Sequence, residues 1–158
     1  MPEGDLLSQL QRCTQGKRVL IVGVGNRLRG DDALGGILVE RLAGKTRATL
    51  IDAGDVPENY LGVIRMAQPE LIIFVDAAEI GGQPGDIALV GAEEMLPANG
   101  WTHSAGLDLT VTYLRSELMV VDIFLLAVQP GTTAFGDDLS PPVRSALLHL
   151  ENLISRLV

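Results

Sequence analysis

The chain contains 158 residues, of which 47% are hydrophobic, 20% are charged and 4% are aromatic. This composition is typical of one globular domain with an aliphatic core and excludes a disordered chain, because about 150 residues can bury roughly 70% of their unfolded surface. The formal net charge of -8 opposes binding to nucleic-acid phosphates and to anionic membranes.

The sequence also indicates the cellular compartment of the protein and limits the chemistry of its cysteine. Residues 1–5 are acidic and lack the basic and apolar stretches of a secretory signal, and charged residues keep the apolar runs short of the roughly 18 residues that a membrane span needs. We therefore expect a cytoplasmic monomer that contacts neither membrane nor nucleic acid. The single cysteine, Cys13, rules out an internal disulfide, and no histidine stands near it to activate a thiol nucleophile.

The first part of the chain predicts a helix, a strand, a loop and a second helix. Residues 1–16 form a peripheral segment with a short helix, and the main domain extends over residues 17–158. The apolar run Val19–Val22 is typical of a buried strand. A glycine-rich loop follows it, and then an amphipathic helix that ends near Gly44.

The rest of the domain alternates strands with helices. Periodicity and turn signals predict strand 49–51, helix 61–65, strand 71–75, strand 86–90, helix 107–114, strand 122–128 and a terminal helix opened by Ser140-Pro141-Pro142. This alternation predicts a single-domain α/β fold, in which helices sandwich a twisted, mostly parallel sheet, as in phosphorylase/hydrolase-like folds. The Pro84-Gly85 turn indicates that one strand pairs antiparallel, whereas the strand order is not predicted.

Each of the first three predicted strands leads to an acid at its carboxyl end. The first reaches Asp31 and Asp32 through its loop, the second ends at Asp52, and the third ends at Asp76. Because ligands of open parallel sheets bind beyond the carboxyl ends of the strands, we expect these acids to converge. His103, which precedes a helical pattern, can join them, since two carboxylates and an imidazole suit a first-row divalent metal.

Each of these residues also has a structural alternative. Either Asp31 or Asp32 can cap the helix that follows, so we expect one of them to cap it and the other to face the crevice. Asp52 stands two residues before Gly54, which favours a turn over metal binding. A lone histidine such as His103 is more often hydrogen-bonded to backbone, so only its combination with the acids indicates a site.

Other motifs do not support competing chemistries. A dinucleotide-binding turn would need a glycine where Leu28 stands, and a phosphate-binding loop that ends at Gly44-Lys45-Thr46 would need one where Val39 stands. Ser104 follows His103, but no Gly-x-Ser-x-Gly elbow surrounds it, and helix capping explains its presence.

Six motifs, taken together, resemble those of the nickel-iron hydrogenase maturation endopeptidases. The resemblance extends from about Lys17 to the end of the chain and is carried by Gly25-Asn26-x-x-x-Gly30-Asp31-Asp32, Ile51-Asp52-Ala53-Gly54, Val75-Asp76-Ala77, Pro84-Gly85, Thr102-His103 and Gln129-Pro130. It implies an endopeptidase that removes a carboxyl-terminal extension from a NiFe hydrogenase large-subunit precursor after nickel insertion. The precursor carries the nickel, although other divalent metals can occupy the site.

The resemblance also implies roles for individual residues. Asp32, Asp76 and His103 would hold the metal and carry the catalysis. Asp52, Asn26 and Asp31 would recognise or position the substrate. Water is then the simplest nucleophile, activated by the metal or by a carboxylate, although a metal that serves only for recognition fits the same residues. Metal binding should weaken below about pH 6, because ligation needs a neutral imidazole.

Two alternatives remain open on the sequence alone. The chain can be a non-catalytic nickel-sensing or carrier module that binds the loaded precursor. It can also be a metal-dependent hydrolase of small molecules on the same scaffold. Loss of mass from the precursor after nickel loading would separate the endopeptidase from both.

Overall fold

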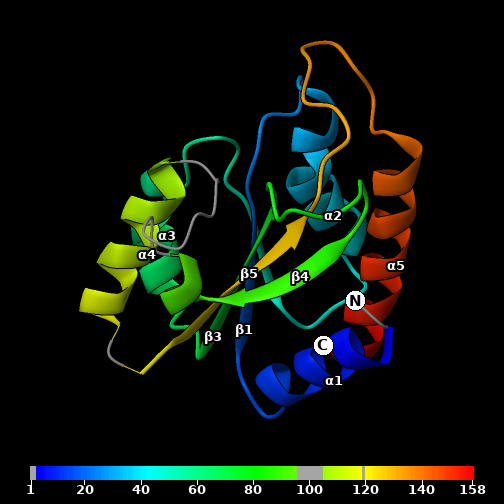
Figure 1. The fold of residues 1–158 in the computed structure, drawn as a ribbon. Helices are drawn as coiled ribbons and strands as arrows, with labels where there is room; N and C mark the ends of the chain where they lie inside the picture. Colours follow the sequence, from blue (N-terminus) through cyan, green and yellow to red (C-terminus); the bar gives the residue numbers. More distant parts are fainter. Residues whose placement is uncertain (1–2, 96–104, 119) are drawn as a thin grey trace.

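The computed structural model describes residues 3–95, 105–118 and 120–158 (Figure 1). Within these residues, five strands form one sheet in the order β2-β1-β3-β5-β4, and all neighbouring strands are parallel except β4 and β5. The strands are β1 (Val19–Gly23), β2 (Thr49–Asp52), β3 (Leu71–Ala77), β4 (Ile87–Gly91) and β5 (Asp122–Val128). The predicted α/β class is confirmed, and the antiparallel strand is β4, which follows the Pro84-Gly85 turn.

Helices cover both faces of the sheet (Figure 1). One face is covered by α1 (Glu3–Thr14), α2 (Leu34–Leu42) and α5 (Pro141–Leu157), and the other by α3 (Leu61–Met66) and α4 (Ala105–Glu117). Three short 3-10 turns that the sequence did not predict connect these elements: η1 (Gly30–Ala33), η2 (Pro57–Tyr60) and η3 (Ala92–Met95). In the described part of the chain, no helix is both long and apolar enough to cross a membrane.

The alternation of side chains along β3 divides the core into two layers. All of β1 is buried, as is β3 up to Asp76, which is expected for parallel strands covered on both faces. Ile73 and Val75 pack with the side chains of α1, α2 and α5, whereas Ile72 and Phe74 pack on the α3 and α4 side. Two hydrophobic layers therefore hold the carboxyl edge of the sheet in place.

The predicted peripheral segment, residues 1–16, contains α1, which lies at the surface and contributes to the core. Its side chains Leu6 and Leu10 are buried and join the same hydrophobic cluster as those of α5. Cys13 is also buried, and this burial raises the pKa of its thiol. A buried thiol of raised pKa is a poor nucleophile.

Two glycines let α2 approach the sheet at the end of β1. A Cβ atom on Gly23 would lie 2.3 Å from the carbonyl oxygen of Gly35, and one on Gly35 would lie 2.4 Å from that of Val75. Backbone therefore contacts backbone where α2 begins. This contact fixes the η1 turn, which carries Asp31 and Asp32, beside the carboxyl edge of the sheet.

Candidate active site

Two acidic residues come together at the carboxyl edge of the sheet. Asp76 lies near the end of β3, is 3% exposed, and has an Oδ1 atom to which no group of the described residues hydrogen-bonds. Burial raises the pKa of Asp76 well above its usual value, and the negative charge of Asp32 raises it further, whereas the N–H of Ala77 lowers it. The structure thus brings together two of the three residues predicted to bind metal. We call Asp32 and Asp76 the acid pair.

The loop between β1 and η1 holds Asp32. Its Oδ2 atom accepts a hydrogen bond from the backbone N–H of Asn26 at 2.8 Å, and Asn26 Oδ1 accepts one from the N–H of Leu28 at 2.8 Å. Gly25 has a φ of 131°, and a Cβ atom there would lie 1.9 Å from the carbonyl oxygen of Asp32, so only glycine fits. Asn26 therefore shapes this loop with both its backbone and its side chain.

Asp31 is fully buried and ties two distant loops together. Its carboxylate accepts hydrogen bonds from the N–H groups of Gly131 at 2.7 Å, Thr132 at 3.0 Å and Ser140 at 2.7 Å, and from the hydroxyl of Ser140 at 2.7 Å. Burial alone would raise the pKa of Asp31, but the bonds from Thr132, Ser140 and Gly131 outweigh it and lower the pKa.

The expectation that Asp31 or Asp32 caps the following helix is wrong. Arg29 precedes η1 and Ala33 precedes α2, and neither position has a side-chain cap. The carboxylate of Asp31 is occupied by the loop after β5, and that of Asp32 accepts the N–H of Asn26. Ser140, which precedes α5, likewise donates its hydroxyl to Asp31 and makes no cap.

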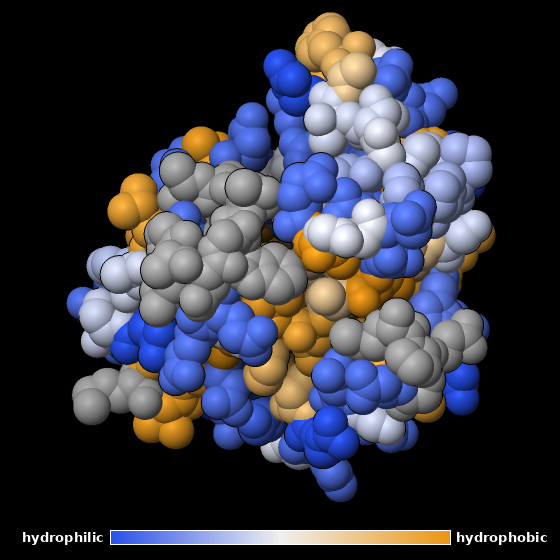
Figure 2. Space-filling model, in the orientation of Figure 1, coloured by the Kyte–Doolittle hydropathy of each residue, from blue (hydrophilic) through white to orange (hydrophobic). Residues whose placement is uncertain are grey.

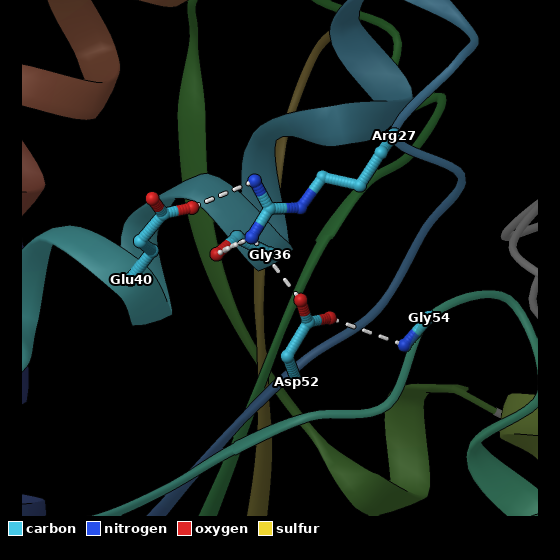
Figure 3. Close-up of polar contacts among 5 residues, drawn as sticks. All are labelled: Arg27, Gly36, Glu40, Asp52 and Gly54. Carbon is cyan, nitrogen blue, oxygen red and sulfur yellow. Dashed lines mark hydrogen bonds and ion pairs between the residues drawn. The ribbon is translucent and has the colours of Figure 1, made fainter.

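Asp52 lies at the end of β2 in a network around Arg27 (Figure 3). Its carboxylate accepts hydrogen bonds from Arg27 at 3.1 Å and from the N–H of Gly54 at 3.2 Å. Arg27 also donates to Glu40 at 2.9 Å and to the carbonyl oxygen of Gly36 at 2.9 Å. The turn that the sequence favours for Asp52 is therefore present, together with an ion pair to Arg27.

A shallow pocket opens between this network and the loop after β2. Its lining consists of Gly25, Asn26, Arg27, Asp52, Gly54, Asp55 and Tyr60. The pocket adjoins the loop that holds Asp32, because Gly25 and Asn26 line it. A larger cavity lies near the amino ends of β1 and β2, and residues such as Lys17 and Arg47 line it.

The third predicted metal ligand, His103, lies outside the described residues, as does Ser104. Within residues 3–95, 105–118 and 120–158, no group of three His, Cys, Asp or Glu side chains is arranged to hold a metal ion. The described part of the candidate site is therefore the acid pair. The other histidine, His149, lies in α5, for which we predicted no chemical role.

One acidic residue beside this edge was not singled out as a site residue from the sequence. Glu58, in η2, has a buried Oε2 atom that accepts no hydrogen bond within residues 3–95, 105–118 and 120–158. It packs against the start of α4, where a Cβ atom on Gly106 would lie 2.2 Å from Glu58 Oε2. No sequence signal pairs these residues, because the contact depends on how η2 and α4 pack.

Comparisons with known proteins agree with this fold. The sequence pattern of the hydrogenase maturation proteases, represented by HycI, matches residues 35–157. Hydrogenase 3 maturation protease of Escherichia coli is 28% identical over 131 residues, which are 81% of this chain and 83% of that protein. The solution structure of an endopeptidase HycI from the same species has a TM-score of 0.76 at 26% identity, and covers 88% of this chain and 90% of its own.

One crystal structure is more similar to this chain than that solution structure is. The NiFe hydrogenase maturation protease HycI from Thermococcus kodakarensis is 31% identical, has a TM-score of 0.86, and covers 94% of this chain and 97% of its own. The fold and these relatives together show that this chain belongs to the class of endopeptidases. The chain belongs to the hydrogenase maturation protease family, which confirms the resemblance of its motifs.

Proposed function

We propose that this chain is a nickel-dependent endopeptidase that removes the carboxyl-terminal extension of a NiFe hydrogenase large-subunit precursor after nickel insertion. The observation that carries the proposal is the acid pair at the carboxyl edge of the sheet, in a chain of this protease family. We further propose that the enzyme acts as a monomer in the cytoplasm. Its substrate is a protein, and nickel enters the site as the cargo of that substrate.

The acid pair suits a divalent cation. Asp76 Oδ1 is buried and accepts no hydrogen bond from the part of the chain that the structure describes, and the charge of Asp32 acts on the same carboxyl group. Asp32 and Asp76 would hold such a cation, whose charge would offset the repulsion between the two carboxylates. We propose His103 as the third ligand, since an imidazole with two carboxylates suits nickel and other first-row divalent metals.

The proposed reaction is hydrolysis of one peptide bond by water. The water oxygen bonds to the scissile carbonyl carbon, a carboxylate of the acid pair takes the water proton, and that proton passes to the amide nitrogen as the C–N bond breaks. Asn26 holds Asp32 in position for this role through its backbone N–H. A bound metal would supply Lewis-acid polarisation of the carbonyl group or would serve for recognition alone.

Substitution of the proposed ligands tests the assignment. We expect Asp32→Asn, Asp76→Asn and His103→Ala each to lower kcat/KM for cleavage of nickel-loaded precursor by about 100-fold or more, because each removes a proton acceptor or a metal ligand. Asp5→Asn, which changes an exposed acid on α1, serves as the control and should retain full activity. Mass spectrometry of the precursor measures the cleavage. Full activity in all three variants would refute the ligand assignment.

The same assay separates the alternative functions. A nickel carrier would bind the loaded precursor in a pull-down without changing its mass. A hydrolase of small molecules would leave both loaded and unloaded precursor intact and unbound. The endopeptidase alone releases a carboxyl-terminal peptide.

A further inference from the structure

Two large apolar side chains project into solvent beside the carboxyl edge. Leu28 is 60% exposed and Phe135 is 71% exposed. They lie on the loops after β1 and after β5, which run side by side, and the N–H of Gly136 donates to the carbonyl oxygen of Leu28 at 2.8 Å. Figure 2 shows hydrophobic surface at the end of the molecule where these loops lie. We call Leu28 and Phe135 the apolar tip.

Hydrogen bonds hold the apolar tip in its exposed position. The N–H of Gly30 donates to the carbonyl oxygen of Asp137 at 3.1 Å, and the N–H of Asp31 donates to that of Thr132 at 2.8 Å. The buried carboxylate of Asp31 binds both ends of the loop that carries Phe135. Two exposed apolar side chains on adjoining loops that hydrogen bonds fix in place form a candidate site for protein interaction.

The apolar tip is linked directly to the acid pair. Leu28 lies in the loop that leads into η1, which carries Asp32. Asn26 bonds to both residues, donating its N–H to Asp32 and accepting the N–H of Leu28. A protein that contacts the tip therefore approaches the acid pair along the same edge of the sheet.

The charges beside the tip indicate the chemistry of the partner. Leu28 stands between Arg27 and Arg29. Arg27 is paired with Glu40 and Asp52, whereas Arg29 has no ion-pair partner in the described part of the chain. An unpaired cation on a chain of net charge -8 favours a partner surface that carries a carboxylate at this place.

We propose that the apolar tip docks the hydrogenase large-subunit precursor through an apolar patch that is bordered by a carboxylate facing Arg29. This inference rests on the proposed function, because it names the surface by which the substrate of that site is recognised. The contact stabilises the bound precursor and the transition state equally. Its loss should therefore raise KM and leave kcat unchanged.

Steady-state cleavage of nickel-loaded precursor by the full chain tests the proposal. We expect Leu28→Ala and Phe135→Ala each to raise KM about tenfold and to leave kcat within about twofold, as for central interface residues. Arg29→Glu should raise KM at low salt and lose this effect at high salt. Leu148→Ala, a leucine on α5 that is 49% exposed, is the matched control and should behave as wild type.

The outcomes distinguish this proposal from the proposed function. If wild-type chain cleaves no precursor, the proposed function fails. If the wild-type chain does cleave precursor, the two tip variants decide about the docking surface. The docking surface is wrong if both variants have the Tm of wild type and also keep the KM of wild type. A wild-type dimer that becomes a monomer in the Phe135→Ala variant by sedimentation would assign the tip to a second copy and would also overturn the proposal.

Discussion

At the scale of residues, Asp31 and Asp32 are neighbours with different environments. The carboxylate of Asp31 is saturated by four donors and has a lowered pKa, whereas that of Asp32 accepts one backbone N–H and acts electrostatically on Asp76. The strand pattern of the sequence places both acids at the carboxyl edge, and only the family resemblance assigns them different roles. The partners of Asp31, at Gly131 and Ser140, lie 100 and 109 residues further along the chain.

This difference predicts how stability depends on Asp31. We expect Asp31→Asn to lower the free energy of unfolding by about 3 kcal/mol near neutral pH, because an amide cannot accept all four hydrogen bonds and leaves buried donors without partners. A carboxyl group with a lowered folded pKa contributes stability above its ordinary value of 3.8. That contribution is lost as the pH falls through the lower folded pKa.

Urea unfolding from about pH 7 to about pH 3 measures this effect. The difference between wild type and Asp31→Asn should be largest at neutral pH and should shrink in acid. Asp138→Asn, at an exposed position in the same loop, should change the free energy of unfolding by less than about 0.5 kcal/mol. Equal stability of wild type and Asp31→Asn at neutral pH would contradict the buried hydrogen-bond network.

At the scale of elements, the backbone contact between α2 and the sheet positions the acid pair. We expect Gly35→Ala to lower the free energy of unfolding by about 2 kcal/mol or more, because the new methyl group would lie 2.4 Å from the carbonyl oxygen of Val75. Displacement of α2 would also move Asp32, so cleavage activity should fall with stability.

A second glycine provides the matched control for this prediction. A Cβ atom on Gly62, in α3, would meet no atom within 4 Å. Gly62→Ala should therefore be neutral or should stabilise the protein by up to about 1 kcal/mol. Thermal and urea unfolding of the two variants measure the contrast, and a Gly35→Ala variant as stable as Gly62→Ala would show that α2 can move without cost.

The same elements show what sequence patterns predict well. The runs that form β1 and β3 are buried and apolar as far as Asp76, as parallel strands covered on both faces must be, and the run that forms β5 is apolar after the exposed Asp122. The turns η1, η2 and η3 have no comparable signal, because each is a single short turn set by its neighbours. The helix predicted to follow Asp31 or Asp32 begins only at Leu34, because η1 intervenes between the loop and the helix.

At the scale of the whole molecule, the sheet order unites acids from separate strands. The order β2-β1-β3-β5-β4 was not predictable, since it depends on which helices pack on which face. The convergence of Asp32 and Asp76 was predictable, because β1 and β3 are parallel neighbours and parallel neighbours end at the same edge. Strand polarity, with Asp76 near the end of β3 and Asp32 on the connection that follows β1, was sufficient for that part of the site. His103 and its role stay a prediction.

The most direct test is the mass of a hydrogenase large-subunit precursor after incubation with wild-type chain, in nickel-loaded and nickel-free form. We expect the loaded precursor to lose a carboxyl-terminal peptide and the nickel-free precursor to stay intact, because the acid pair engages the nickel that the substrate carries. Removal of nickel by a chelator before incubation should abolish the cleavage. Equal cleavage of both forms, or of neither, would contradict a nickel-dependent endopeptidase.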